Sequence, residues 1–157
     1  MKPAHRNEWL KYLPNELPNE RLAEMKKHAV CALTGSATDV TLDHFIPLEW
    51  GHGGQYAGNV LFLTARLNAS KSNMNPFRWI NRAKLREPNL QRGWDELIRR
   101  MAADNGLGTR EFRRYVHWCE KHKRSKEQLR LDPRPSLELW REARIREDER
   151  ASVDTAR

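Results

Sequence analysis

The spacing of apolar residues predicts a small sheet followed by a helix in the first half of the chain. Two short runs rich in β-forming residues, 30–33 and 40–45, are separated by TGSATD, which supplies the Gly, Ser, Thr and Asp typical of a hairpin turn. A further apolar run at 60–63 leads to Thr64, which can cap a helix over 65–72. We therefore expect an antiparallel hairpin with a helix packed across it.

The regions on either side of this segment are predicted to be helical. The first 19 residues contain three prolines and are expected to form an irregular arm that docks through its aromatic side chains, with a short helical piece inside it. In the second half, apolar residues recur at helical spacing from Leu90 to Met101. Capping and helix-breaking residues place the expected helices at 19–28, 76–87, 90–104, 109–120 and 136–150.

Together these elements predict an α+β fold with a small ββα core. A chain of 157 residues is long enough for one domain with its own core and too short for two comfortable ones. Within that single domain we expect an N-terminal arm and helix at 1–28, the core at 29–75, and a helical extension at 76–157 that binds nucleic acid.

The charge of the chain favours a polyanionic partner. Lys and Arg number 29 against 21 Asp and Glu, a net charge of +8, and nucleic acid is the natural candidate. Residues 29–80 carry three basic and three acidic side chains, whereas residues 81–157 carry 20 and 14. A helical surface with paired charges is the alternative explanation of this basic flank.

Other features of the composition predict a cytoplasmic protein with no membrane partner. Cys31 and Cys119 are the only cysteines and lie far apart in the sequence, so neither a disulfide framework nor a four-cysteine zinc site can form. The N-terminus lacks the apolar core of a signal peptide, and no run approaches the roughly 18 apolar residues needed to span a bilayer.

The segment 42–71, LDHFIPLEWGHGGQYAGNVLFLTARLNASK, concentrates the side chains that can carry out chemistry. Asp43 and His44 place an anionic oxygen beside a group that can take a proton near neutral pH, as metal-assisted hydrolysis of a phosphodiester requires. Strict strand alternation would put the two on opposite faces, so we expect a bend or bulge near this point to bring them together. Asn68 and Lys71 share one helix face, which can aim Asn68 at Asp43.

The glycine-rich loop inside this segment contains two further candidates. Four glycines fall within residues 51–58, so the loop must bend sharply or let another backbone approach. Asn59 can bond backbone groups across the loop and hold it closed, with an ordinary turn residue as the alternative. His52 is a competing candidate for a metal ligand or second base, and a solvent-facing loop residue is its alternative.

The order and spacing of these residues resemble the HNH endonuclease family. The shared pattern is a D-H pair, a Pro three residues on, a Gly-rich loop, an Asn, a second Asn nine residues later and a Lys three residues after that. The resemblance covers roughly residues 29–75 and looks most like the Asp-His-Asn-Asn type found in phage HNH enzymes and in the HNH domain of CRISPR nucleases. It implies a ββα-metal core around one cation.

The resemblance also implies a role for each residue. Asp43 and Asn68 would ligate one Mg²⁺ ion, for which Mn²⁺ can substitute, because oxygen ligands favour these cations. His44 would be the general base, and Asn59 would steady the loop beside it. Lys71 would contact phosphate. The implied activity is hydrolysis of DNA by a metal-dependent endonuclease of phage or mobile-element type.

Many members of that family carry four cysteines that hold a structural zinc. The matching positions here are Cys31, Thr34, Thr64 and Leu67. Three of them cannot supply a thiolate, so we expect no structural zinc. An apolar substitute would be formed by Val30, Leu33 and Leu67.

Basic residues near the core and in the KHKRSK tract are candidate contacts to DNA. Besides Lys71 they are Arg66, Arg78, Lys121, Lys123 and Arg124. A solvated helix end is the alternative for the tract. Phage packaging or replication proteins are possible partners besides DNA, and a monomer or a weak dimer is expected. A non-catalytic nucleic-acid-binding module and an RNA-cutting toxin are the alternative functions.

Overall fold

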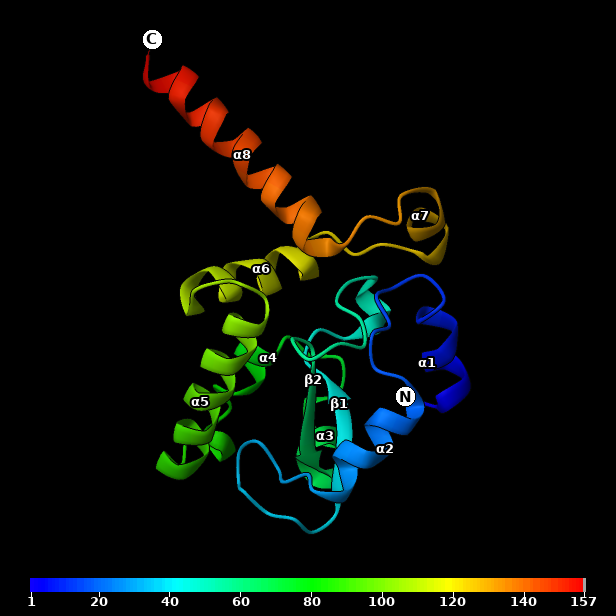
Figure 1. Cartoon of the computed structure of the whole chain (residues 1–157). Helices are drawn as coiled ribbons and strands as arrows, with labels where there is room; N and C mark the ends of the chain where they lie inside the picture. Colours follow the sequence, from blue (N-terminus) through cyan, green and yellow to red (C-terminus); the bar gives the residue numbers. More distant parts are fainter. Residues whose placement is uncertain (157) are drawn as a thin grey trace.

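The chain folds into a two-stranded antiparallel sheet surrounded by helices (Figure 1), which confirms the α+β class. The computed structural model describes residues 1–156, with Ala83 described by its backbone only. The strands are β1 (Val40–His44) and β2 (Val60–Thr64). The helices are α1 (Pro3–Trp9), α2 (Asn19–Lys27), α3 (Ala65–Lys71), α4 (Pro76–Trp79), α5 (Pro88–Asp104), α6 (Thr109–Lys121), α7 (Lys126–Leu131) and α8 (Ser136–Thr155), with 3-10 turns η1 (Leu48–Trp50) and η2 (Ala83–Leu85).

β1 pairs with β2 along the full length of both strands, so the expected pairing with residues 30–33 is wrong. Those residues form a tight turn instead, in which the Gly35 N–H donates to the Cys31 carbonyl at 2.8 Å. Cys31 and Leu33 are buried in the core. The β-forming residues that suggested a strand are therefore buried in a turn, which contacts β2 through the bond from the Ala32 N–H to the Phe62 carbonyl at 2.9 Å without joining the sheet.

The helix α3, which follows β2, begins directly after its N-cap residue Thr64. Thr64 Oγ1 accepts a hydrogen bond from the Leu67 N–H at 3.3 Å, and α3 begins at Ala65 as expected. α3 packs against both strands. The chain thus builds a compact strand–strand–helix unit, and the direction of α3 across the sheet is set at its first turn.

Residues 76–87, expected as one helix, form the short α4 and the η2 turn instead. Phe77, Trp79 and Ile80 are all buried, and three buried positions within four residues do not share one helical face. The chain turns after α4 so that these residues are covered from several sides. The helix α7 was not expected; Ser125 and Gln128 cap its first turn reciprocally.

One apolar core joins the sheet to the helices of the second half. Phe45, which follows β1, packs on Phe77, Trp94 and Phe112 with ring centroids 5.8, 5.7 and 5.3 Å away. The same cluster extends to Trp140 in α8. Because α5 and α6 cover the end of the strand unit in this way (Figure 1), the helical extension fixes the position of the chain segment that leaves β1.

The C-terminal helix α8 projects away from the body of the molecule (Figure 1). Ser136 and Trp140 are its only buried residues, and the helix continues to Thr155, beyond the expected end at 150. None of the helices in residues 1–156 combines the length and apolar character that crossing a membrane requires.

The N-terminal arm packs against the turn that follows β1, as expected from its aromatic residues. It contributes to a second apolar cluster, whose buried members are Trp9, Leu10, Leu13, Leu48 and Leu129. Further along the arm, Asn15 pairs with Gln55 of the glycine-rich loop in an isolated bridge. These contacts hold the arm, including α1, beside the end of β1.

Candidate functional site

A cavity of about 400 Å³ opens where the end of β1, the η1 turn, α3 and the N-terminal arm meet. Asp43, His44 and Asn68 all line it, so the structure brings together the three residues that the sequence assigned to metal binding and base catalysis. Asn59 and Lys71 lie behind its wall, where both are buried. The candidate site is therefore built by one strand, the helix that crosses it, and an arm from the start of the chain.

Asp43 and His44 reach the same cavity without a bulge in the strand. β1 stays regular to His44, which pairs directly with Val60, so no bulge separates the two residues, and the chain bends directly after them at Phe45 and Ile46. β1 has β2 on one edge, and its other edge is free in the two-stranded sheet. A cavity that runs around this free edge meets side chains from both faces of the strand, which explains how adjacent residues line it together.

The His44 imidazole is buried and neutral at physiological pH. Burial lowers its pKa to about 4, because burial penalises the charged ring. The neighbouring Asp43 carboxylate and Gln55 carboxamide act in the opposite direction, toward the protonated form. Even so, His44 Nε2 and Gln55 Oε1 are both buried without a normal hydrogen bond among residues 1–156, so any contact between them is long. A neutral imidazole in this setting can accept a proton.

Lys71 occupies a different position from the one expected for a phosphate contact. Its side chain is 1 % exposed, and Nζ lies 2.7 Å from Asp43 Oδ2 in an ion pair that lacks good hydrogen-bond alignment. Nζ also donates to the His44 carbonyl at 3.1 Å and to the Ser72 carbonyl at 3.4 Å. The ammonium group therefore balances the charge of Asp43 and ties α3 to β1, and it does not face the cavity.

Asn68 is held by its amide nitrogen, which leaves its amide oxygen free. Nδ2 donates to Thr41 Oγ1 at 2.9 Å and to the Leu42 carbonyl at 3.3 Å. These two bonds fix the side chain along β1, and within residues 1–156 Oδ1 accepts no hydrogen bond. An oriented amide oxygen beside a carboxylate is a suitable pair of ligands for a hard cation.

Asn59 is fully buried and closes the glycine-rich loop. Its Oδ1 accepts from the Ile46 N–H at 2.8 Å, while Nδ2 donates to the Gly54 carbonyl at 2.8 Å and to the Ile46 carbonyl at 3.2 Å. Gly53 has a φ of +72°, and a Cβ on it would lie 2.6 Å from Asn59 Nδ2, so this position needs glycine. The Asn59 carbonyl also accepts from the Phe45 N–H at 2.7 Å, which makes the loop and the end of β1 one unit.

His52 takes no part in the cavity. It is fully buried, with Nδ1 2.8 Å from Ser136 Oγ and Nε2 2.6 Å from the His122 carbonyl. Because a carbonyl only accepts, Nε2 carries the proton and Nδ1 accepts from Ser136. Burial lowers the pKa of His52 to about 4. His52 therefore connects the glycine-rich loop to the C-terminal part of the chain, and neither of its sequence-based interpretations describes it.

The depressed pKa values of His44 and His52 predict that acid destabilises the fold. A histidine that is neutral when folded stabilises the protein fully above its unfolded pKa near 6.5, and this contribution is lost as the pH falls toward 4. Between pH 7.5 and pH 5.0 each should cost about 2 kcal/mol of unfolding free energy. Urea denaturation at the two pH values measures the loss, and His52→Gln should make it smaller. An equal loss in His52→Gln and in the exposed control His28→Gln would contradict this assignment.

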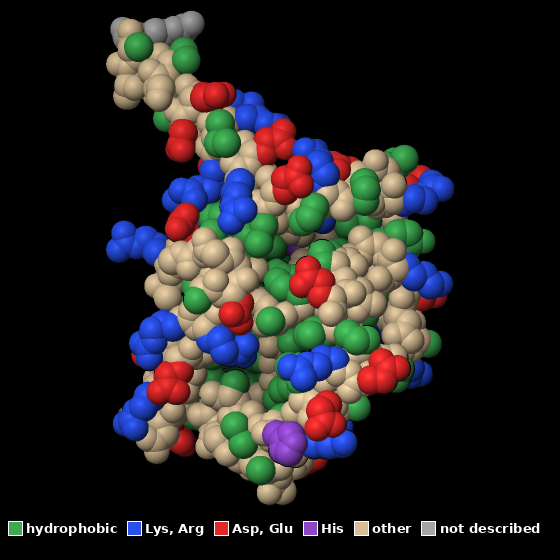
Figure 2. Space-filling model, viewed as in Figure 1, with side chains coloured by type: hydrophobic (Ala, Val, Ile, Leu, Met, Phe, Trp, Pro, Cys, Tyr) green, Lys and Arg blue, Asp and Glu red, His purple; other side chains and the backbone are tan. Residues whose placement is uncertain are grey.

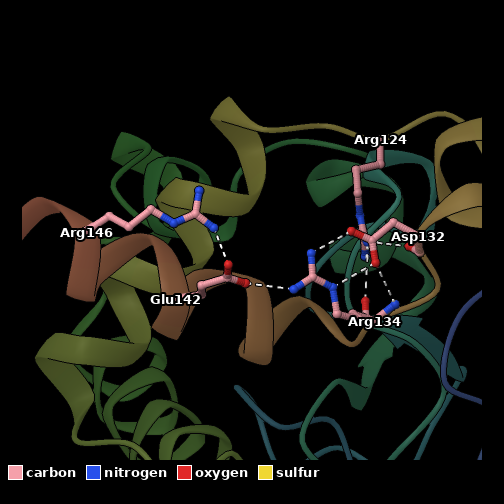
Figure 3. A network of polar contacts seen from close by, with 5 residues as sticks. All are labelled: Arg124, Asp132, Arg134, Glu142 and Arg146. Atoms are coloured by element: carbon pink, nitrogen blue, oxygen red, sulfur yellow. Dashed lines mark hydrogen bonds and ion pairs between the residues drawn. The ribbon is translucent and has the colours of Figure 1, made fainter.

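Arg124 connects the glycine-rich loop to the linker before α8 through its guanidinium group. Its Nε donates to the Gly51 carbonyl at 3.1 Å, and Nη1 donates to the carbonyls of Asp132 and Arg134 at 3.3 Å each. Figure 3 shows how these contacts continue into a chain of ion pairs from Arg134 to Glu142 of α8. Arg124 thus fixes the linker before α8 against the glycine-rich loop, and its expected role as a DNA contact stays a prediction.

The other basic candidates lie at the surface. Arg78 pairs with Glu120, Lys123 lies 5.5 Å from the centroid of the Trp50 ring, and Lys121 is exposed. Arg66 lines a second cavity of about 680 Å³ on another side of α3, together with Arg82 and Lys84. On the face seen in Figure 2, Lys and Arg alternate with Asp and Glu and do not form one basic patch.

The positions that match the zinc cysteines of the family surround this second cavity. Thr34, Thr64 and Leu67 line it, and Cys31 is buried nearby in the core. Leu33 is also buried, but Val30 is 51 % exposed, so Val30 does not belong to an apolar substitute for zinc. Within residues 1–156, no three His, Cys, Asp or Glu side chains converge on a point where they could hold a metal ion.

Two residues of the cavity escaped the sequence interpretation. Arg6 from α1 and Glu49 from η1 both line it, and Arg6 Nε and Glu49 Oε2 are buried atoms without a hydrogen-bond partner in the described part of the chain. With His44 Nε2 and Asp43 Oδ2, which has only its ion pair with Lys71, four such atoms belong to residues that line one cavity. Unpaired buried polar atoms are rare in folded proteins and commonly mark the place of a water, an ion or a ligand. No spacing rule links Arg6 to β1, because only the docking of the arm brings them together.

The donor set around the cavity fits a cation of the Mg²⁺ type. Mg²⁺ is commonly held by one or two protein oxygens and completes its shell with water and substrate phosphate. Asp43 and the free Oδ1 of Asn68 provide these oxygens, with Lys71 as a competing positive charge on the carboxylate. Comparison of the chain with protein-family models, with curated proteins and with solved structures gave no match.

Proposed function

We propose that this protein is a metal-dependent endonuclease of the HNH type that hydrolyses phosphodiester bonds of DNA. The observation that supports it most strongly is the convergence of Asp43, His44 and Asn68 on one cavity, with the His44 ring neutral and its Nε2 unpaired. A carboxylate, an amide oxygen and a neutral imidazole are the groups that metal-assisted phosphodiester hydrolysis uses.

In this proposal each side chain has one task. Asp43 and Asn68 would hold the cation, and its chemistry would be to neutralise negative charge that develops during cleavage. His44 removes the proton from the attacking water, and cleavage leaves 3′-hydroxyl and 5′-phosphate ends. Asn59 keeps the end of β1 in place through its bonds to Ile46. A single site of this kind cuts one strand, so cutting a duplex needs a second encounter or a second copy of the protein.

One contact favours a different function, a nucleic-acid-binding module without catalysis. Lys71 already neutralises Asp43 at 2.7 Å, and a site whose carboxylate is permanently paired has less need of a cation. The two functions differ in one measurable respect, since only the nuclease needs a divalent ion to change its substrate.

Incubation of supercoiled plasmid with the wild-type protein tests the proposal. We expect Mg²⁺ or Mn²⁺ to support nicking or linearisation, and we expect a chelator to abolish it, because the two oxygen ligands alone do not polarise the phosphate. A gel-shift assay in chelator should still show binding. Binding without cleavage in either metal, with no cleavage of a parallel RNA substrate, would identify the non-catalytic module. Preferential cleavage of that RNA would identify an RNA-cutting enzyme.

A further inference from the structure

The cavity needs a cationic side chain that Lys71 does not supply. A phosphodiester bound beside the Asp43 carboxylate has to be held by positive charge or strong hydrogen-bond donors, because like charges repel. The Lys71 ammonium is buried, and it is already engaged by Asp43 and by two backbone carbonyls. Among the side chains that line the cavity, Arg6 is the only lysine or arginine.

We propose that Arg6, carried into the site by the N-terminal arm, binds the phosphate group on which the site acts. The inference rests on the proposed nuclease function and adds to it a residue that lies outside the strand–strand–helix unit. A guanidinium is suited to this task, because its planar set of N–H donors matches the oxygens of a phosphate and its charge persists at any working pH.

Arg6 is not engaged elsewhere in the fold. Across residues 1–156 its side chain makes no hydrogen bond and no ion pair, and its Nε is buried without a partner. The acidic residue on the same wall, Glu49, has its Oε1 3.6 Å from His5 Nε2 and is not paired with Arg6. A buried donor without a partner destabilises the folded protein, and a bound phosphate oxygen would supply the missing acceptor.

The position of Arg6 is set by residues on both sides of it in α1. Trp9 is buried and its Nε1 donates to His5 Nε2 at 3.4 Å. Glu8 forms an ion pair with Lys126 of α7 at 2.6 Å, and the Lys126 ammonium lies 5.2 Å from the centroid of the Trp9 ring. These contacts join α1 to the distant helix α7, so Arg6 is presented to the cavity from a fixed support.

Three different elements bring the side chains of the site to the cavity. Asn68 faces the cavity from α3, His44 from the end of β1, and Arg6 from the arm. A phosphate bound in the cavity would contact the Arg6 guanidinium directly. On the side of Asn68, a cation would supply the positive charge.

Two readouts test the inference, one of which does not depend on catalysis. The variants are Arg6→Ala and Arg6→Lys, with Arg21→Ala, an exposed arginine of α2 outside the cavity, as the charge-matched control. Under saturating plasmid and Mg²⁺, Arg6→Ala should cleave about 100-fold more slowly, as loss of one charge-stabilising donor does. Arg6→Lys should recover part of the rate, and Arg21→Ala should stay within about twofold. Titration of inorganic phosphate in chelator, followed by the arginine Nε–H signals in NMR, should shift one signal that is missing in Arg6→Ala.

The outcomes separate this inference from the proposed function. A wild type that cleaves, with Arg6→Ala as active as Arg21→Ala, overturns the role of Arg6 and leaves the nuclease in place. A wild type that does not cleave but whose Arg6 signal responds saturably to phosphate overturns the nuclease and supports Arg6 as the phosphate-binding residue. A wild type that neither cleaves nor shows the Arg6 response overturns both.

Discussion

Replacement of His44 by alanine is expected to lower the rate of DNA cleavage by about 10³-fold, because a positioned general base contributes roughly 10²–10⁴-fold to such a reaction. His44 makes no side-chain hydrogen bond within residues 1–156, and its backbone pairing in β1 does not depend on the ring. The variant should therefore fold and bind DNA like the wild type. Plasmid cleavage in Mg²⁺, with a gel shift in chelator, measures both properties on the same preparation.

The pH dependence of the wild type gives a second test of His44. Burial holds the pKa of His44 near 4, so the base stays neutral through the range in which an exposed histidine would gain a proton. We expect cleavage to show no loss from His44 protonation between pH 8 and about pH 5.5, and to fall only below that range. His28→Ala, at an exposed position on another part of the surface, serves as the control. A His44→Ala variant as active as His28→Ala would rule out His44 as the base.

Replacement of Asn59 by alanine is expected to lower the free energy of unfolding by about 3–5 kcal/mol. The change removes three hydrogen bonds and leaves the Ile46 N–H and the carbonyls of Ile46 and Gly54 buried without their partner. Asn59→Asp keeps the shape and one acceptor, but it turns a carboxylate oxygen toward two carbonyls and should cost at least as much. Because the same bonds fix the chain just after His44, cleavage should also weaken in the protein that remains folded.

Urea denaturation at pH 7.5 measures this effect, and Asn89→Ala offers a control asparagine at an exposed position of α5. The control should change the unfolding free energy by less than about 0.5 kcal/mol, as is usual for surface substitutions away from specific contacts. A loss of less than about 1 kcal/mol in Asn59→Ala would show that the glycine-rich loop does not depend on these bonds.

The candidate site could be predicted from the sequence where its members are close in the chain. Asp43 and His44 are adjacent, and Asn68 and Lys71 lie on one turn of a helix whose start Thr64 determines. Local rules for strands, caps and helical faces therefore placed them near one another. The long α5 was predicted for the same reason, since its apolar spacing and the Asn105-Gly106 stop are local signals.

The errors concern contacts between distant segments. Residues 30–33 have the composition of a strand, but the stronger partner for β1 is β2, whose position depends on the whole core. Lys71 and Arg124 were both predicted to contact phosphate. In the fold, Lys71 is buried against Asp43, and Arg124 is half-buried against carbonyls of the linker. The sequence shows that a side chain is basic, but the tertiary structure determines which group it pairs with.

The sequence by itself determined the kinds of groups present and their local order: a carboxylate and an imidazole at a strand end, a loop that needs glycine, and an amide on the following helix. These follow from rules that act over a few residues. Only the tertiary structure decided that the arm brings Arg6 to the cavity, that Lys71 turns inward, and that His52 joins the loop to the C-terminal segment. The physical reason is that burial and charge pairing depend on which surfaces meet, and surfaces far apart in the chain meet only when the core has formed.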